Sequence, residues 1–161
     1  MFSGETIGTL LRTLGVLHVV TIPDSTLGRW ESGIESAGIS LIRVCREGEA
    51  WAVAGGLYLG GKRPLVMIQC TGLFESGDAL RTILHDWKLP IPSIIGYRSY
   101  LNQSTLPGDT CLTFTEPILD AWQIPYLLVT APEQLDAMAE QLRSAYALGA
   151  PKAVLVAEGK A

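Results

Sequence analysis

Short apolar runs rich in β-branched residues alternate with longer segments of helical period along the chain, and this alternation limits the fold most strongly. The run at residues 65–68 is apolar throughout, as expected for a strand covered on both faces. Six such strands separated by helices predict one α/β domain over residues 1–161, a three-layer α/β/α sandwich with a six-stranded, mainly parallel sheet. The predicted strands are residues 17–22, 39–44, 65–68, 91–96, 126–129 and 153–156. The predicted helices are residues 5–14, 27–37 and 47–60, one within 71–86, a short one near 116–122, and a last one after Thr130.

Two local patterns refine this prediction. Residues 97–114 are predicted to form a long polar loop. Thr130 and Glu133 fit a capping box at the start of the last helix, with Pro132 in its first turn.

Right-handed crossovers bring the loops that follow parallel strands to one edge of the sheet, where ligands of such sheets bind. We therefore expect the functional residues in these loops. They are residues 23–26, 46–48, 70–75, 97–114 and 130–132.

The composition excludes several classes of protein. With 48% hydrophobic and 17% charged residues the chain is not intrinsically disordered, and 12 basic against 16 acidic residues argue against a nucleic-acid surface. No uncharged apolar stretch approaches the ~18 residues of a membrane span. The three cysteines without a CxxC pair predict a reduced, cytoplasmic setting with each cysteine as a small core residue, and only two histidines argue against a metal site. So few charges indicate that a partner covers part of the surface.

The helix predicted at residues 47–60 combines acidic residues at its start with an unusual interior. Acidic residues in a first turn often only complement the helix dipole. This helix, however, is apolar almost all round and contains the pair Gly55 and Gly56, each of which costs ~1 kcal/mol relative to alanine. A helix that is apolar on all sides must be buried on all sides. Glu47 is therefore expected where a burying interface meets the ligand-binding edge.

The run at residues 46–64 resembles the pyrimidine-binding domain of thiamine-diphosphate-dependent enzymes. In that family a glutamate opens a helix, a glycine follows nine residues later, and a Gly-Lys-x-Pro turn leads to the next strand; Glu47, Gly56 and residues 61–64 match these places. Residues 68–73, 22–27 and 96–98 resemble the family's other loops, in the same order. The nearest likeness is to the small alpha subunits of sulfopyruvate and phosphonopyruvate decarboxylases, which consist of this domain alone.

The resemblance implies a catalytic role for Glu47. A carboxyl group shut away from water can keep a proton and share it with N1′ of the aminopyrimidine, which activates thiamine diphosphate. The thiazolium then serves as the electron sink for loss of carbon dioxide from a small 2-oxo acid. By the same resemblance Thr71, Gly72 and Leu73 pass beneath the aminopyrimidine and bind it. Spacing alone fits an ordinary turn with a left-handed Gly72 equally well.

Three further residues are candidates for substrate binding. The resemblance places the hydroxyl of Ser25 beside the substrate, together with Asp24, whose residue type also fits plain turn chemistry. Arg98 suits a sulfonate, phosphonate or carboxylate group, although an arginine in such a loop is commonly a surface side chain.

The resemblance also implies a division of labour between subunits. The diphosphate-binding motif Gly-Asp-Gly…Asn is not present, because neither Gly77-Asp78 nor Gly108-Asp109 is followed by glycine. We therefore expect a beta subunit that carries that domain and most of the Mg²⁺ ligands, in an assembly built on a homodimer or on two copies of each subunit.

One segment departs from the family pattern. Phe74 and Glu75 replace the usual glycine and asparagine, which narrows the pocket and adds negative charge. Two alternatives therefore stay open: a small-ligand-binding module with a flavodoxin-like sheet, and a homologue that only scaffolds a complex.

Overall fold

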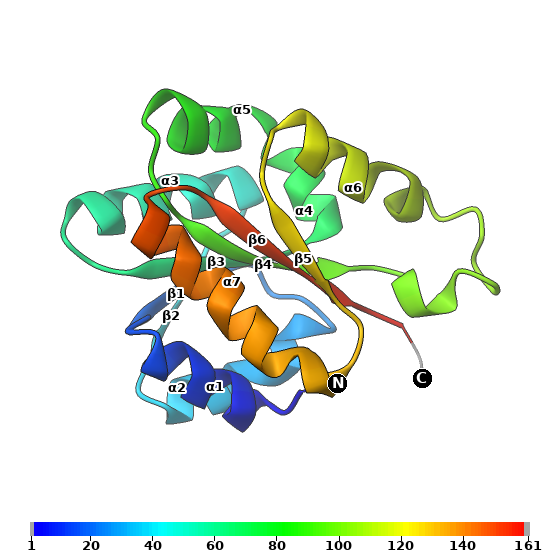
Figure 1. Ribbon diagram of the computed structural model, residues 1–161, viewed down its shortest axis with the longest axis horizontal. Helices are drawn as coiled ribbons and strands as arrows, with labels where there is room; N and C mark the ends of the chain where they lie inside the picture. Colours follow the sequence, from blue (N-terminus) through cyan, green and yellow to red (C-terminus); the bar gives the residue numbers. More distant parts are fainter. Residues whose placement is uncertain (1, 160–161) are drawn as a thin grey trace.

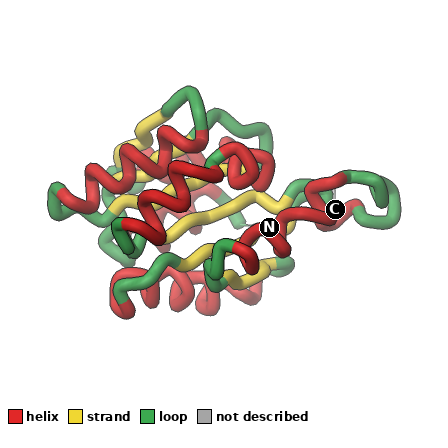
Figure 2. Tube along the Cα trace, turned by 90° about the horizontal axis from the view of Figure 1, so that it is seen from above, coloured by secondary structure: helices red, strands yellow, loops and turns green. Residues whose placement is uncertain are grey.

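The computed structural model describes residues 2–159, which form one parallel sheet between two layers of helices (Figures 1 and 2). All neighbouring strands pair in parallel, in the order β2-β1-β3-β4-β6-β5. This confirms the predicted α/β class, and the sheet is entirely parallel. The strands are β1 (His18–Thr21), β2 (Ser40–Arg43), β3 (Pro64–Gln69), β4 (Pro92–Tyr97), β5 (Tyr126–Val129) and β6 (Lys152–Ala157).

The helices divide between the two faces of the sheet (Figure 1). One face is covered by α1 (Gly4–Thr13), α2 (Glu31–Ser36) and α7 (Leu135–Leu148), the other by α3 (Glu47–Leu59), α4 (Cys70–Glu75), α5 (Gly77–Leu80) and α6 (Thr110–Ala121). Short 3-10 helices are formed by η1 (Leu27–Trp30), η3 (Tyr100–Asn102) and η4 (Pro132–Gln134). A π-helical segment, η2 (Arg81–Asp86), continues α5.

Strand β3 shows why the apolar runs are continuous. Leu65 and Met67 point into the core beneath α1, α2 and α7, whereas Val66 and Ile68 point into the core beneath α3 to α6. Successive side chains of a strand alternate between faces, so a strand buried on both faces has no polar position.

Helices α1 and α2 touch through their backbones. A Cβ atom on Gly33 would lie 2.1 Å from the carbonyl carbon of Gly4, and a Cβ atom on Gly8 would lie 2.4 Å from the carbonyl oxygen of Gly33. Only glycine permits so close an approach. These contacts hold η1 and α2 beside the start of α1.

The prediction for residues 97–122 was wrong in part. Residues 97–114 are not one long loop, because η3 and the first turn of α6 lie within them and α6 runs from Thr110 to Ala121. Asp109 caps α6 by accepting a hydrogen bond from the Cys111 N–H at 2.9 Å. Pro117 lies inside the helix, whereas proline favours a first turn, so the pattern places the start too late.

Three smaller corrections concern local chemistry. Gln134, not Glu133, caps the start of the last helix, since its Oε1 accepts from the backbone N–H groups of Thr130 and Ala131 at 2.8 and 3.1 Å. The turn expected from residue 71 is not present, because α4 begins at Cys70 directly after β3. Cys70 and Cys111 are core residues as predicted, but Cys45 is exposed.

The chain changes face at the centre of the sheet. After β1 it turns into η1 and α2, and after the neighbouring strand β3 it turns into α4 on the opposite face. Loops that diverge in this way leave a crevice outside the carboxyl ends of the strands. The predicted functional loops meet at this edge.

Candidate active site

Three carboxylates lie near the start of α3, and two of them are engaged by the backbone. Glu49 accepts a hydrogen bond from the Cys45 N–H at 3.0 Å, and Glu75 accepts one from the Gly48 N–H at 2.8 Å. No described residue donates a hydrogen bond to the half-buried carboxylate of Glu47. Glu47 is therefore the carboxylate at this helix start that remains available to a ligand.

The negative charge of Glu75 is compensated by neighbouring groups. Its Oε1 accepts from the Arg46 guanidinium at 2.9 Å, while its Oε2 holds the Gly48 N–H. The backbone donor, followed by Arg46, keeps the pKa of Glu75 below its ordinary value. The negative charge that Glu75 brings to this loop is thus paired with Arg46.

Gly72 supports Glu47 from α4. A Cβ atom at this position would lie 2.3 Å from Cγ of Glu47, so the two residues are in contact only because residue 72 has no side chain. The hydroxyl of Ser76 donates to the Gly72 carbonyl at 2.6 Å and accepts from the Trp51 indole N–H at 2.9 Å. This buried link ties α4 to α3 and holds Gly72 against Glu47.

The other residues predicted to bind the cofactor have distinct surroundings. Gly72 lies in helical backbone, without the left-handed conformation that a turn would need. Leu73 is a core residue, and Thr71 is exposed, with its hydroxyl 3.3 Å from Oε1 of Gln69.

Ser25 and Arg98 meet in one cavity of about 490 Å³, which we call the polar compartment. Gln69 at the end of β3 and Glu158 after β6 also line it. The Arg98 guanidinium lies 3.3 Å from the Asp109 carboxylate and is half exposed. The structure thus brings together two of the three residues that the sequence proposes for substrate binding.

Asp24 holds in place residues that line this compartment. Its Oδ1 accepts from the N–H groups of Thr26 and Leu27 at 2.7 and 2.6 Å, which is the geometry of a turn. Its Oδ2 accepts from the Gln69 amide at 3.0 Å. Asp24 therefore shapes the loop after β1 and orients Gln69.

Sequence reasoning missed Glu158. Its carboxyl group is 4% exposed and lies directly over Gly96, where a Cβ atom would come within 1.8 Å of Oε1. Oε2 accepts from the Gln69 amide at 3.1 Å, but Oε1 has no hydrogen-bond partner among the described residues. Burial, followed by the charge of Asp24, raises the pKa of Glu158 to about 7. The available signal was an acidic residue placed directly after a buried strand, at the edge where ligands bind.

The raised pKa of Glu158 predicts a dependence of stability on pH. The folded state binds the Glu158 proton more tightly than the unfolded chain does. The contribution of this proton to the free energy of unfolding is therefore fully present below pH 4.5 and is lost as the pH rises to about 7. Glu158→Gln mimics the protonated form. We expect this variant to be more stable than the parent chain by up to about 3 kcal/mol at pH 8 and equally stable at pH 4.5. Urea unfolding of both proteins at the two pH values measures the difference; an equal difference at both values would contradict it.

Residues 69–72 lie between Glu47 and the polar compartment. Gln69 holds Asp24 and Glu158 in the polar compartment, and Gly72 contacts Glu47. One short segment after β3 therefore links the carboxylate at α3 with the compartment that contains Ser25 and Arg98.

The described part of the chain contains neither a metal-binding cluster nor a membrane-spanning helix. Within residues 2–159 no three histidine, cysteine or acidic side chains are grouped so that they could hold a metal ion. None of the described helices has the length and apolar character needed to span a bilayer.

The fold and the site define an open, doubly wound parallel sheet with a ligand crevice at its carboxyl edge. No family model matches the sequence. The chain is 27% identical over 135 residues to the alpha subunit of sulfopyruvate decarboxylase from Methanococcus maripaludis, which covers 83% of this chain and 81% of that subunit. It is 28% identical over 100 residues to the corresponding subunit from Methanocaldococcus jannaschii, covering 62% of this chain and 59% of that subunit.

Among solved structures, benzoylformate decarboxylase from Polynucleobacter necessarius shares the fold with a TM-score of 0.73 at 21% identity. The match covers 97% of this chain and 30% of that enzyme, so the chain corresponds to less than one third of it. The chain is a distant homologue of sulfopyruvate decarboxylase alpha subunits. This confirms the resemblance predicted from the motifs.

Proposed function

We propose that this chain is the alpha subunit of a thiamine-diphosphate-dependent 2-oxo acid decarboxylase, active together with a diphosphate-binding beta subunit. The distant homology to alpha subunits of sulfopyruvate decarboxylase supports the class of enzyme. The observation that carries the proposal is the free carboxylate of Glu47 against the bare backbone of Gly72.

The residues present fit the proposed cofactor. Glu47 offers acceptor oxygens that no described residue occupies, and buried Gly72, which has no side chain, leaves the space in which the Glu47 side chain lies. These two residues, with Thr71 and Leu73, would hold the aminopyrimidine. When bound, thiamine diphosphate supplies the electron sink for the release of carbon dioxide from the 2-oxo acid.

In this proposal Glu47 holds a proton at the ring nitrogen N1′. Half-burial by α4 reduces the access of water, and a partner subunit would complete the exclusion. Ser25 and Arg98, which line the polar compartment, orient the carboxylate of the substrate. The pairing of Glu75 with Arg46 removes the objection that the altered loop adds uncompensated negative charge.

The outer face of α3 supports the proposal of a partner. Ala52, Gly56 and Leu59 are exposed along this face, and the Leu59 side chain is 63% accessible. Gly55 is explained within the chain, because its Cβ position meets Ile83 at 3.0 Å, but no atom lies within 4 Å of a Cβ on Gly56. An apolar face of this kind suits an obligate interface, with the beta subunit providing most of the Mg²⁺ ligands.

The test is reconstitution. The chain is co-expressed with a candidate beta subunit that contains the Gly-Asp-Gly…Asn motif, and the purified complex is screened for release of carbon dioxide from a series of 2-oxo acids with thiamine diphosphate and Mg²⁺. We expect turnover with the parent complex and none with Glu47→Ala. Tight binding of thiamine diphosphate and Mg²⁺ by the isolated chain would contradict the proposed division between subunits.

A further inference from the structure

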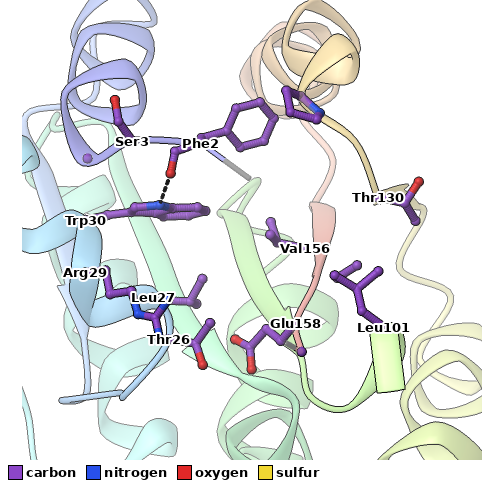
Figure 3. A pocket seen from close by; sticks show the side chains of 14 residues that line it. Phe2, Ser3, Thr26, Leu27, Arg29, Trp30, Leu101, Thr130, Val156 and Glu158 are labelled. Atoms are coloured by element: carbon purple, nitrogen blue, oxygen red, sulfur yellow. Dashed lines mark hydrogen bonds between the residues drawn. The ribbon is translucent and has the colours of Figure 1, made fainter. Parts of the chain in front are cut away.

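A second, larger cavity adjoins the polar compartment (Figure 3). It has a volume of about 700 Å³, and we call it the apolar compartment because most of its wall is hydrophobic. The wall includes Phe2, Leu27, Trp30, Leu101 and Val156.

The two compartments have a common boundary. Thr26, Arg29, Glu158 and Gly159 line both cavities. Figure 3 shows the Glu158 carboxyl group directed toward Thr26 and away from Leu101, whose N–H donates a hydrogen bond to the Glu158 carbonyl at 2.9 Å. A ligand that spans the boundary would therefore contact Glu158.

One carboxyl oxygen of Glu158 lacks a hydrogen-bond partner within the described part of the chain. Its Oε1 is buried and has no hydrogen-bond partner of good geometry among the described residues, and the nearby Thr26 hydroxyl only partly offsets the effect of burial on the pKa of Glu158. A buried polar atom without a partner is costly, and such atoms in native proteins call for an explanation. Oε1 lies against Gly96, so a ligand oxygen would accept its hydrogen bond, and remove this cost, once the protonated carboxyl group turns toward the cavity.

The described charged groups around the cavity leave one guanidinium, that of Arg29, for an anionic group of a ligand. Arg29, Arg98 and Glu158 line the polar compartment, Asp109 pairs with Arg98, and Asp24 accepts from the Gln69 amide. These charges balance when Glu158 is protonated. No described acidic side chain forms an ion pair with Arg29, so its guanidinium is available to a carboxylate.

We propose that the two compartments together bind a monocarboxylate with an aryl or branched alkyl tail, and that Glu158 takes up a proton when this ligand binds. The ligand carboxylate lies between Arg29 and Arg98, and the tail lies among Trp30, Leu27 and Leu101. This inference rests on the proposed function where it identifies the ligand as the 2-oxo acid substrate. A second anionic group at the far end of the ligand, such as a sulfonate, would meet apolar walls in the apolar compartment and is disfavoured there.

The pH dependence follows from the groups that face Glu158. Asp24 and Thr26 lie on the loop after β1, Arg29 on η1, Gln69 on β3 and Arg98 after β4, and Glu158 in the chain without ligand has a pKa of about 7. Ligand binding that requires the protonated form weakens about ten-fold for each pH unit above this value, until the pKa of the complex is reached.

Titration calorimetry on the full chain, without cofactor or partner, tests the inference. The probes are benzoylformate, as the aryl 2-oxo acid, and sulfopyruvate, as the dianion. At pH 6 we expect benzoylformate to bind at least about ten-fold more tightly than sulfopyruvate, because only its tail buries apolar surface. At pH 8, titrations in two buffers of different ionisation enthalpy should show about one proton taken up per ligand bound.

Three variants separate the contributions. Glu158→Gln should still bind benzoylformate, but with no proton uptake and with the same affinity at pH 6 and pH 8. Glu140→Gln, an exposed glutamate on α7, should behave as the parent chain. Leu101→Ser should reduce the preference for benzoylformate, since Leu101 lines the apolar compartment.

Equal affinity for the two acids, absence of proton uptake by the parent chain, or undiminished uptake by Glu158→Gln would overturn the inference. The two proposals fail separately. A reconstituted complex that decarboxylates 2-oxo acids while the chain alone binds no benzoylformate would overturn this inference and leave the proposed function intact. If the chain binds benzoylformate with proton uptake but its complex never supports turnover, the proposed function is overturned and this inference is left intact.

Discussion

Glu47→Gln is expected to lower the rate of decarboxylation by the reconstituted complex about 10²–10⁴-fold while the fold and partner binding are retained. Glutamine keeps the size of the side chain and its contact with Gly72, but it cannot share a carboxyl proton with a ring nitrogen. Steady-state kinetics with thiamine diphosphate and Mg²⁺ measure the loss, and circular dichroism with size-exclusion chromatography verifies the fold and the complex.

Glu49 provides the matched control for this experiment. It lies two residues away in the same first turn, but its carboxylate is engaged with the Cys45 N–H. Glu49→Gln should therefore lose little turnover. A similar loss in both variants, or full activity of Glu47→Gln, would remove Glu47 from the proposed mechanism.

Gly33→Ala is expected to destabilise the chain by about 3 kcal/mol or more. Its Cβ atom would lie 2.1 Å from the carbonyl carbon of Gly4 and 2.4 Å from the Glu5 nitrogen, and backbone atoms cannot yield as the end of a flexible side chain can. Overpacking of this kind costs about 1–3 kcal/mol and occasionally more, because α1 and α2 must separate. Urea unfolding at one pH value measures the change in the free energy of unfolding.

Gly56→Ala is the control for a glycine without neighbours. It lies in α3 with no atom within 4 Å of the added Cβ, so the substitution should stabilise the isolated chain by up to about 1 kcal/mol. If Gly33→Ala were as stable as Gly56→Ala, the close contact of α1 and α2 would be wrong.

The layout of the sheet could be predicted well because it depends on local properties. Residues 64–69 form β3 close to the predicted bounds, since an uninterrupted apolar run has few ways to bury itself other than a strand covered on both faces. Helix α6 was predicted less well, because its start depends on the cap at Asp109 and its interior contains Pro117. Short polar residues and a proline obscure the helical period there.

The candidate site, like the fold, could be predicted from the sequence only in part. Glu47 could be proposed from its place at the start of a helix and from the family resemblance, and its role remains a prediction. Glu158 has no neighbours in sequence that explain its raised pKa. Its surroundings come from Gln69, 89 residues earlier, and from Asp24 on the loop after β1.

The amino-acid sequence by itself determined which segments become strands and helices and which edge carries the ligand crevice, because hydrophobic period and crossover handedness act over short stretches of chain. Only the tertiary structure decided which acidic side chains are free to act. Glu75 is engaged by Gly48, 27 residues away, and Glu47 and Glu158 keep acceptor atoms without a described partner. The physical reason is that hydrogen bonding and burial of a carboxylate are set by the segments packed around it, and these segments are distant in sequence.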